Sequence, residues 1–279
     1  MLDTISENKN YDTSDTIVVC GAPRTGTTWL AEVLNCIPDS TILWEPLHVL
    51  QVPEVSETGL SWRTEIQQNS SWPEAEELFR KILSGELQNK WTMSRSRHRK
   101  DEYTKHWIVK FVRANRLLRW LCDNFSTRPP ILLVRHPCAV VASTLRTTWA
   151  KQQNFRGITE NWCEDYARLL GLDIPHPWKL VCYEHLAKQP QKQFENIFKA
   201  IGVEIPNSYM DFVNNPSSTV FKNTALANDL DPLSQWQSDL SVAEISEILH
   251  ITRSYGITLY NKSVEPDLSV FQALIGRNN

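Results

Sequence analysis

The sequence predicts an α/β protein in which a mostly parallel sheet is flanked by helices in a single domain. Short apolar segments with strand character alternate along the chain with segments of helical spacing, an order typical of parallel sheets that are covered on both faces. Gly21 and Gly26 form a Gly-x4-Gly motif between the first strand and the first helix. That spacing, in that context, is typical of a P-loop-type fold.

Five segments are expected to form the strands. The first, residues 16–21, is rich in β-branched residues and ends at Gly21. The others are residues 41–44, 107–112, 131–134 and 179–183. The segment 131–134 is the longest purely aliphatic run, and it is far shorter than the roughly 20 residues that span a bilayer. The sequence therefore predicts no membrane span.

The helices are expected from apolar spacing and from capping signals. Residues 27–36 have helical spacing directly after the Gly-x4-Gly motif. Ser71 and Glu74 have the pattern of a capping box and predict a helix to about residue 83. Pro137 suits the first position of a helix to about residue 145. Further helices are predicted over residues 117–125, 194–201 and 241–252.

One domain is expected over residues 16–260, between a flexible N-terminal segment, 1–15, and a C-terminal tail, 261–279. The chain carries no repeat, low-complexity tract or linker that would divide it. Residues 51–70 and 214–239 are irregular and are expected to run over the sheet. Lids and acceptor pockets often lie in such excursions.

The composition excludes several classes of protein. Hydrophobic residues make up 41% and charged residues 22%, enough apolar material for a core and too much for global disorder. The net charge of -3 disfavours a nucleic-acid partner, because polyanion-binding proteins are usually basic. The N-terminus is polar and predicts no signal peptide. Six cysteines without a CxxC pair indicate a reduced, cytoplasmic protein with no zinc site.

The loop after the first strand carries the strongest chemical signal. It reads Gly-Ala-Pro-Arg-Thr-Gly-Thr-Thr over residues 21–28. The start of the following helix offers unpaired N–H groups and the positive end of a dipole to an anion. Hydroxyl donors are added by Thr25, Thr27 and Thr28. A nucleotide kinase has Lys directly after the second Gly, whereas here that position is Thr27 and the cation is Arg24.

Residues 23–29, Pro-Arg-Thr-Gly-Thr-Thr-Trp, resemble the 5′-phosphosulfate loop of the sulfotransferases that use 3′-phosphoadenylyl sulfate (PAPS). Residues 131–143 resemble the family's second motif, in which a strand ends in Arg and Ser follows eight residues later. The resemblance implies that Arg135 and Ser143 hold the 3′-phosphate that distinguishes PAPS from ATP. His136 replaces the commoner Asp and is expected to cap or orient the turn.

A third segment, residues 180–186, resembles the family's Leu-x-Tyr-Glu-Asp-Leu strand end. It implies that Tyr183 contacts the nucleotide and that Glu184 braces the neighbouring loop. The cofactor-binding residues implied by the three motifs are Arg24, Thr25, Gly26, Thr27, Thr28, Arg135, Ser143 and Tyr183. The donor would be PAPS, and the product left after transfer would be adenosine 3′,5′-bisphosphate (PAP). No metal is expected to be required, because helix N–H groups and Arg supply the positive charge. The family's Arg-Lys-Gly loop is not recognisable, and Lys222 is a candidate replacement.

The catalytic base does not follow the cytosolic members, which use His in a Lys-Thr-His strand. Here Val112 stands in the His position, although Lys110 remains. Residues 44–48, Trp-Glu-Pro-Leu-His, resemble the Tyr-Glu-Pro segment of carbohydrate sulfotransferases, which implies Glu45 as the base. The resemblance of the phosphate loop implies that Arg24 stabilises the transferring sulfuryl group. Two alternatives stay open: Glu45 is a structural cap or ion-pair partner, or His48 is the base.

The resemblance implies a sulfotransferase with a hydroxyl acceptor, a carbohydrate or another small metabolite. Residues 90–105 are rich in Lys and Arg and could attract an acidic acceptor, although such a run is more often a solvated loop surface. Tryptophans suit sugar stacking but are also common in cores; they are Trp44, Trp62, Trp72, Trp91 and Trp149. Two other functions remain: an ATP-dependent P-loop kinase and an inactive nucleotide-binding module. Acceptor identity, O- versus N-sulfation and oligomeric state stay open.

Overall fold

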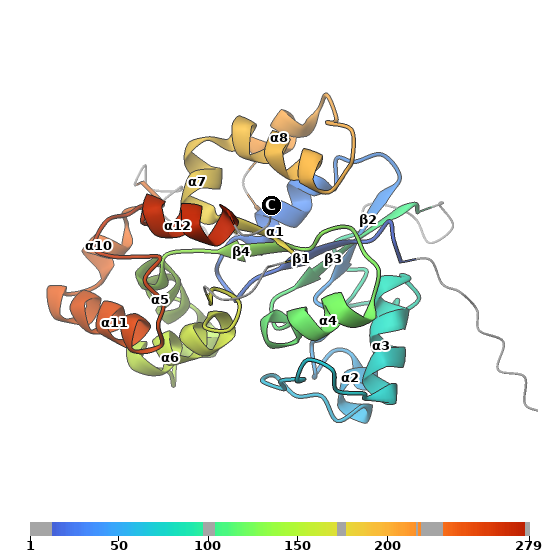
Figure 1. Ribbon diagram of the computed structural model, residues 1–279, viewed down its shortest axis with the longest axis horizontal. Coiled ribbons are helices and arrows are strands. Elements are labelled where there is room, and N and C mark those ends of the chain that lie inside the picture. The colour runs from blue at the N-terminus through green and yellow to red at the C-terminus, as the bar shows by residue number, and fades with distance from the viewer. Residues whose placement is uncertain (1–12, 97–103, 172–176, 216, 219–230, 277–279) are drawn as a thin grey trace, which may run out of the picture.

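A computed structural model describes residues 13–96, 104–171, 177–215, 217–218 and 231–276. Its centre is a 5-stranded sheet of order β2-β3-β1-β4-β5, in which every neighbouring pair is parallel (Figure 1). The strands are β1 (Ile17–Cys20), β2 (Ser40–Trp44), β3 (His106–Phe111), β4 (Ile131–Val134) and β5 (Lys179–Cys182). The predicted fold class and the five predicted strands are confirmed.

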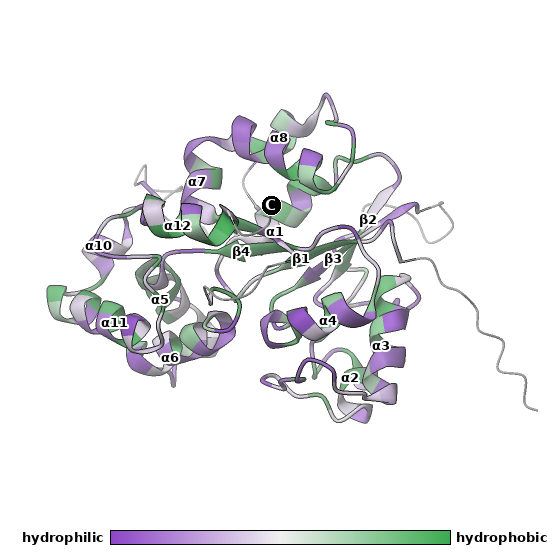
Figure 2. Cartoon of the chain, viewed as in Figure 1, coloured by the Kyte–Doolittle hydropathy of each residue, from purple (hydrophilic) through white to green (hydrophobic). Residues whose placement is uncertain are grey.

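Alternate residues of the strands point to two separate cores. Val18 and Cys20 belong to one apolar cluster, and Ile17 and Val19 belong to the other. Helices α1 (Thr27–Leu34) and α8 (Pro190–Ala200) cover the face of Ile17 (Figure 1). The opposite face is covered by α3 (Pro73–Leu83), α4 (Leu118–Asn124) and α6 (Phe155–Tyr166). Because both faces are buried, the central strands β1 and β4 are apolar throughout, and Figure 2 shows the middle of the sheet largely in the green of hydrophobic residues.

The remaining helices are short or lie at the ends of the sheet. They are α2 (Pro53–Glu57), η1 (Asn115–Leu117), α5 (Pro137–Leu145), η2 (Thr148–Ala150), α7 (Tyr183–Lys188), α9 (Tyr209–Val213), α10 (Trp236–Asp239), α11 (Val242–Ser254) and α12 (Leu268–Ile275). Residues of α5, α6, α10 and α11 form a third apolar cluster beside the sheet. Within the described residues, no helix is long and apolar enough to cross a membrane.

Helix α6 was not predicted, although its sequence signals are complete. Asn154 caps it by accepting a hydrogen bond from Gly157 N at 2.9 Å. Ile158, Trp162 and Tyr166 follow at intervals of one helical turn and are buried. The many polar residues between them obscure this pattern in the sequence.

The predicted capping box of Ser71 and Glu74 is wrong. Helix α3 begins at Pro73, whose fixed φ and missing N–H suit the first helical position. The helix start is therefore shifted, and Glu76 instead accepts hydrogen bonds from Trp72 N at 3.1 Å and Ser71 Oγ at 3.3 Å. A capping box does form elsewhere, between Ser241 and Glu244 at the start of α11.

The two predicted ends of the domain are partly described. Of residues 1–15, only 13–15 are described, and there Thr13 is buried and Asp15 is paired with Arg128. The segment 261–279 contains α12, in which Leu274 is buried against the core of the domain. This C-terminal helix therefore packs on the domain.

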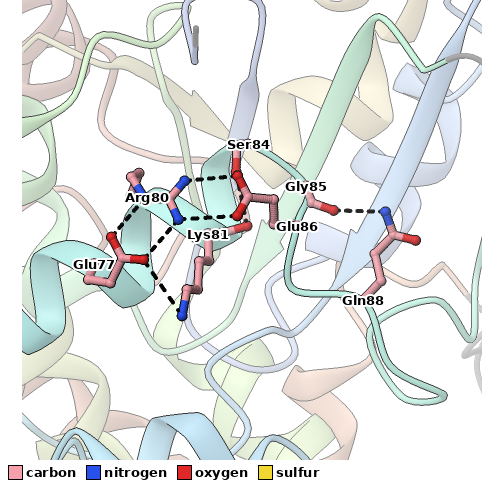
Figure 3. Close-up of polar contacts among 7 residues, drawn as sticks. All are labelled: Glu77, Arg80, Lys81, Ser84, Gly85, Glu86 and Gln88. Carbon is pink, nitrogen blue, oxygen red and sulfur yellow. Dashed lines mark hydrogen bonds and ion pairs between the residues drawn. The ribbon is translucent and has the colours of Figure 1, made fainter. Parts of the chain in front are cut away.

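The turn after α3 leads the chain toward the end of β2. Arg80 donates hydrogen bonds to Glu77 and Glu86 across the exposed surface of the turn (Figure 3), contacts that contribute little to stability. Gly85 has φ of 74°, and a Cβ there would lie 1.9 Å from the Trp107 ring, so this position requires glycine. The chain then passes the end of β2, where Trp44 N donates to Thr92 O at 2.7 Å.

Candidate active site

A cavity of about 560 Å³ lies at the carboxyl ends of the strands. Residues that follow each of the strands line it: Arg24 after β1, Glu45 after β2, Arg113 after β3, Arg135 after β4 and Tyr183 after β5. Strands β2 and β3 lie on one side of β1, whereas β4 and β5 lie on its other side. The order of the strands therefore reverses at β1. Ligands of open α/β sheets bind at such a switch point.

The phosphate loop is shaped by its two glycines. Gly26 has φ of 99°, caps α1, and accepts a hydrogen bond from Leu30 N at 3.1 Å. A Cβ at Gly26 would lie 2.6 Å from the Tyr183 ring, and one at Gly21 would lie 2.7 Å from Leu133 O. Both positions therefore exclude a side chain, which allows the loop to lie directly against β4 and against Tyr183, the residue that follows β5.

The three hydroxyl donors predicted in this loop do not all face the cavity. Thr27 and Thr28 line the cavity at the start of α1. The Thr25 hydroxyl instead donates to Ala22 O at 2.7 Å, and its side chain is fully buried. Thr25 thus closes the loop, and it is absent from the cavity lining in the described part of the chain.

The predicted donor-binding residues converge on one end of the cavity. Arg24 Nε donates to Ser143 Oγ at 3.0 Å, and Arg135 Nη1 donates to Arg24 O at 3.2 Å. The Arg135 guanidinium lies 4.3 Å above the centre of the Tyr183 ring. Its buried Nε has no hydrogen-bond partner in the described residues, so the group retains donor capacity for an anion.

A third cation, Arg146, lines the same end and was missed from the sequence. It lies one helical turn after Ser143, at the end of α5, and pairs with Asp239 of α10. Burial lowers the pKa of Arg24, and the charges of Arg135 and Arg146 lower it further. Arg24 is thus within electrostatic range of two further cations and donates to the Ser143 hydroxyl, an arrangement that suits a ligand with several negative charges.

Tyr166 fixes the phosphate loop from below and was also missed. Its hydroxyl accepts from Ala22 N at 2.9 Å and donates to Leu133 O at 2.6 Å. The hydroxyl thereby joins the loop after β1 to strand β4. Burial raises the pKa of Tyr166 far above its ordinary value, so the hydroxyl keeps its proton. Only the prediction of α6 would have placed this residue.

His136 and Glu184 brace the turn that carries Arg135, as the sequence predicts. His136 caps α5 by accepting from Cys138 N at 3.2 Å, and its Nε2 contacts Asn261 O at 2.9 Å. Glu184 accepts from His136 N at 2.8 Å and from Tyr260 Oη at 2.8 Å. Burial lowers the pKa of His136 to about 4, so the ring is neutral at pH 7.

Glu45 lies at the other end of the cavity, with φ of 38°. Its Oε1 accepts from Lys110 Nζ at 2.6 Å, and its Oε2 lies 3.7 Å from Arg113 Nη1. Burial lowers the pKa of Lys110, while the Glu45 charge acts in the opposite direction. Glu45 is thus an ion-pair partner that also faces the cavity, and the geometry is compatible with both functions considered from the sequence.

Tryptophans form the wall around Glu45. Lys110 Nζ lies 3.8 Å from the centre of the Trp44 ring, and the Arg113 guanidinium lies 4.0 Å from that of Trp62. His48 contacts Trp62 and Trp91 edge to face, with ring centres 4.7 Å and 4.6 Å apart. The pKa of His48 is lowered, chiefly by burial and then by Arg113.

The remaining predicted residues differ in where they lie. Trp72 packs on the core, whereas Trp149 lines the cavity and is 57% exposed. Lys222 and residues 97–103 of the basic run lie outside the described residues. Among those that are described, no three His, Cys, Asp or Glu side chains are placed to hold a metal ion. That no metal is required stays a prediction.

Fold and cavity define an α/β protein of the P-loop type. The model of the sulfotransferase family matches residues 16–207. The chain belongs to this family, which confirms the resemblance to PAPS-dependent sulfotransferases and the predicted class of enzyme. No curated protein sequence matches the chain significantly.

Two solved structures share the fold. The sulfotransferase domain of the Synechococcus PCC 7002 olefin synthase is 18% identical with a TM-score of 0.52, covering 88% of this chain and 96% of that one. A retinol dehydratase in a complex with retinol and PAP is 13% identical with a TM-score of 0.50, covering 88% and 82%. At these identities the likeness is one of fold alone.

Proposed function

We propose that the protein transfers a sulfuryl group from PAPS to a hydroxyl group of a carbohydrate or another small metabolite. The observation that carries this proposal is the convergence of Arg24, Ser143 and Arg135 at one end of a single cavity. These residues come from two motifs that lie far apart in the sequence. PAP in the similar retinol dehydratase structure is consistent with the same donor.

The donor would lie across the phosphate loop. Thr27, Thr28 and the N–H groups at the start of α1 would hold its 5′-phosphosulfate. Arg135 and Ser143 would hold its 3′-phosphate through charge-assisted hydrogen bonds. Tyr183, against Gly26 and below Arg135, would contact the nucleotide. The cations of this end supply positive charge without a metal ion.

Glu45 is proposed as the base. It would accept the proton of the acceptor hydroxyl while the acceptor oxygen bonds to sulfur and the bond from sulfur to the bridging phosphate oxygen breaks, with PAP as the leaving group. Arg24 would stabilise the charge on the transferring group and the bridging oxygen. The contacts of Glu45 with Lys110 and Arg113 orient its carboxylate toward the cavity.

The donor is tested by calorimetric titration with PAP and with ATP, each with and without EDTA. We expect tight binding of PAP that does not depend on metal, and weaker binding of ATP, which lacks the 3′-phosphate. A preference for ATP with Mg²⁺ would instead support the kinase alternative, which the match to the sulfotransferase family disfavours.

The base is tested with Glu45→Gln. We expect kcat to fall by about 10²- to 10⁴-fold, while the Kd for PAP stays unchanged because Glu45 lies at the opposite end of the cavity. His48→Asn is the matched variant, since His48 is the alternative base. If turnover survives in Glu45→Gln and collapses in His48→Asn, the assignments are reversed. If the wild type binds PAP but sulfates no hydroxyl compound, the inactive module is favoured.

We also propose a cytoplasmic location. All six cysteines are free thiols in this structure, and Cys20 and Cys182 are buried in strands of the sheet. Reduced cysteines are the norm in the cytoplasm.

A further inference from the structure

Arg113 differs from the other cations of the cavity in what it contacts. Its nearest carboxylate oxygen, Glu45 Oε2, lies at 3.7 Å, which is beyond hydrogen-bond distance. The other oxygen of that carboxylate is occupied by Lys110 at 2.6 Å. Within the part of the chain that the structure describes, the Arg113 guanidinium donates no hydrogen bond. One carboxylate thus faces two cations, and the positive charge of Arg113 is only partly balanced.

The neighbouring Arg116 shows what a fully paired guanidinium looks like in this region. Arg116 Nε donates to Asp165 at 3.1 Å, and its Nη2 donates to Glu164 at 2.5 Å. Asp165 also acts on Arg113 electrostatically, but its carboxylate is bonded to Arg116. The two arginines are three residues apart, yet only Arg113 lines the cavity.

The Arg113 guanidinium is held in place by stacking, and its hydrogen-bond donors stay available. It stacks 4.0 Å from the centre of the Trp62 ring, which fixes its plane and leaves its edge N–H groups open to a ligand. The side chain is 28% exposed, so these groups are largely removed from bulk water. Burial lowers the pKa of Arg113, as expected for a cation whose solvation is incompletely replaced.

The charges at the two ends of the cavity form separate groups. The cations that act on Arg24 are Arg135 and Arg146, whereas the charges that interact with Arg113 are those of Glu45, Asp165 and Lys110. Donor phosphates held by the first group therefore do not account for Arg113. Its planar fork suits a carboxylate or a phosphate at the end of the cavity where Glu45 would take the acceptor proton.

We propose that the acceptor is a hydroxylated anion, and that Arg113 binds its carboxylate or phosphate group while the hydroxyl to be sulfated faces Glu45. This inference rests on the proposed function, because it takes the Glu45 end of the cavity as the acceptor site. Trp62 and His48 then form the apolar wall beside the acceptor. Arg113 is a specificity-determining residue of the transfer reaction.

The test uses acceptors that share a hydroxymethylphenyl group and differ in the group opposite the hydroxymethyl, titrated into the PAP-loaded protein so that the proposed donor site is occupied. The probes are para-hydroxymethylbenzoate, its uncharged methyl ester and para-hydroxymethylphenyl phosphate, with tryptophan fluorescence and calorimetry as readouts. We expect the anions to bind at least about tenfold more tightly than the ester, and this preference to fall to within about twofold in Arg113→Gln. The two anions show whether carboxylate or phosphate is preferred.

Arg63→Gln is the matched control, because Arg63 pairs with Glu164 outside the cavity lining. It removes the same charge and is expected to keep the preference. Unchanged PAP binding in Arg113→Gln shows that the variant is folded, and Arg113→Lys is expected to retain part of the preference. Equal binding of anions and ester by the wild type, or binding of none of them, overturns the proposal. Failure of PAP to bind overturns the proposed function instead.

Discussion

The two ends of the cavity are assembled in different ways. At the β4 and β5 end, Arg135 and Ser143 are eight residues apart on one strand–turn–helix. At the β2 and β3 end, Trp62 and Trp91 come from loops that no local pattern connects to Arg113. An anion that is bound by backbone and by one turn leaves a short motif in the sequence. A pocket that is walled by distant side chains leaves none.

Arg135→Ala is expected to give the largest effect and to be confined to the donor end. The affinity for PAP should fall by about a hundredfold, because the charged hydrogen bonds that we propose between Arg135 and the 3′-phosphate would be lost. Binding of adenosine 5′-monophosphate, which lacks this phosphate, should change by only about twofold. Calorimetry measures both. Equal weakening of the two nucleotides would contradict the assignment of Arg135 and remove the distinction between the two ends.

The loss of stability at acid pH should also come from the β4 and β5 end of the cavity, through His136. Folding lowers the pKa of His136 from 6.5 to about 4, so its contribution is present above 6.5 and is lost as the pH falls from there toward 4. Protonation would turn the Nδ1 acceptor for Cys138 N into a donor. Between pH 7.5 and 5 this costs about 2 kcal/mol of unfolding free energy.

Denaturant titrations of the wild type and of His136→Asn at the two pH values check this expectation. The variant should be less stable at neutral pH and should lose less stability on acidification. An identical pH dependence of the two proteins would show that other groups carry the acid sensitivity.

Tyr166→Phe sharpens the comparison, because Tyr166 lies outside both motifs. Removing its hydroxyl leaves Ala22 N and Leu133 O without their shared partner, and we expect PAP binding to weaken by about tenfold. Binding of the acceptor probes to the PAP-loaded protein should be unchanged. Trp162→Phe, in the same helix, is the control for a general loss of packing. Unaltered PAP affinity in Tyr166→Phe would mean that the loop keeps its shape without this contact.

The sequence predicted most of the residues that converge at the β4 and β5 end of the cavity, because their motifs are local. A P-loop needs two glycines, a strand before them and a helix after them, and these lie within residues 16–36. Arg146 was missed because a single arginine after a helix has no distinctive pattern. Tyr166 was missed because its contacts with residues 22 and 133 exist only once α6 packs under the sheet.

The sequence by itself determined the fold class, the order of the strands along the chain and the residues of the phosphate loop. These follow from periodicity and from short-range backbone geometry, which neighbouring residues impose on one another. Only the tertiary structure decided that Lys110 contacts both Glu45 and the Trp44 ring, and that Arg113 lines the same cavity. Such juxtapositions depend on which strands lie side by side, because parallel pairing of β2 with β3 brings their carboxyl ends together.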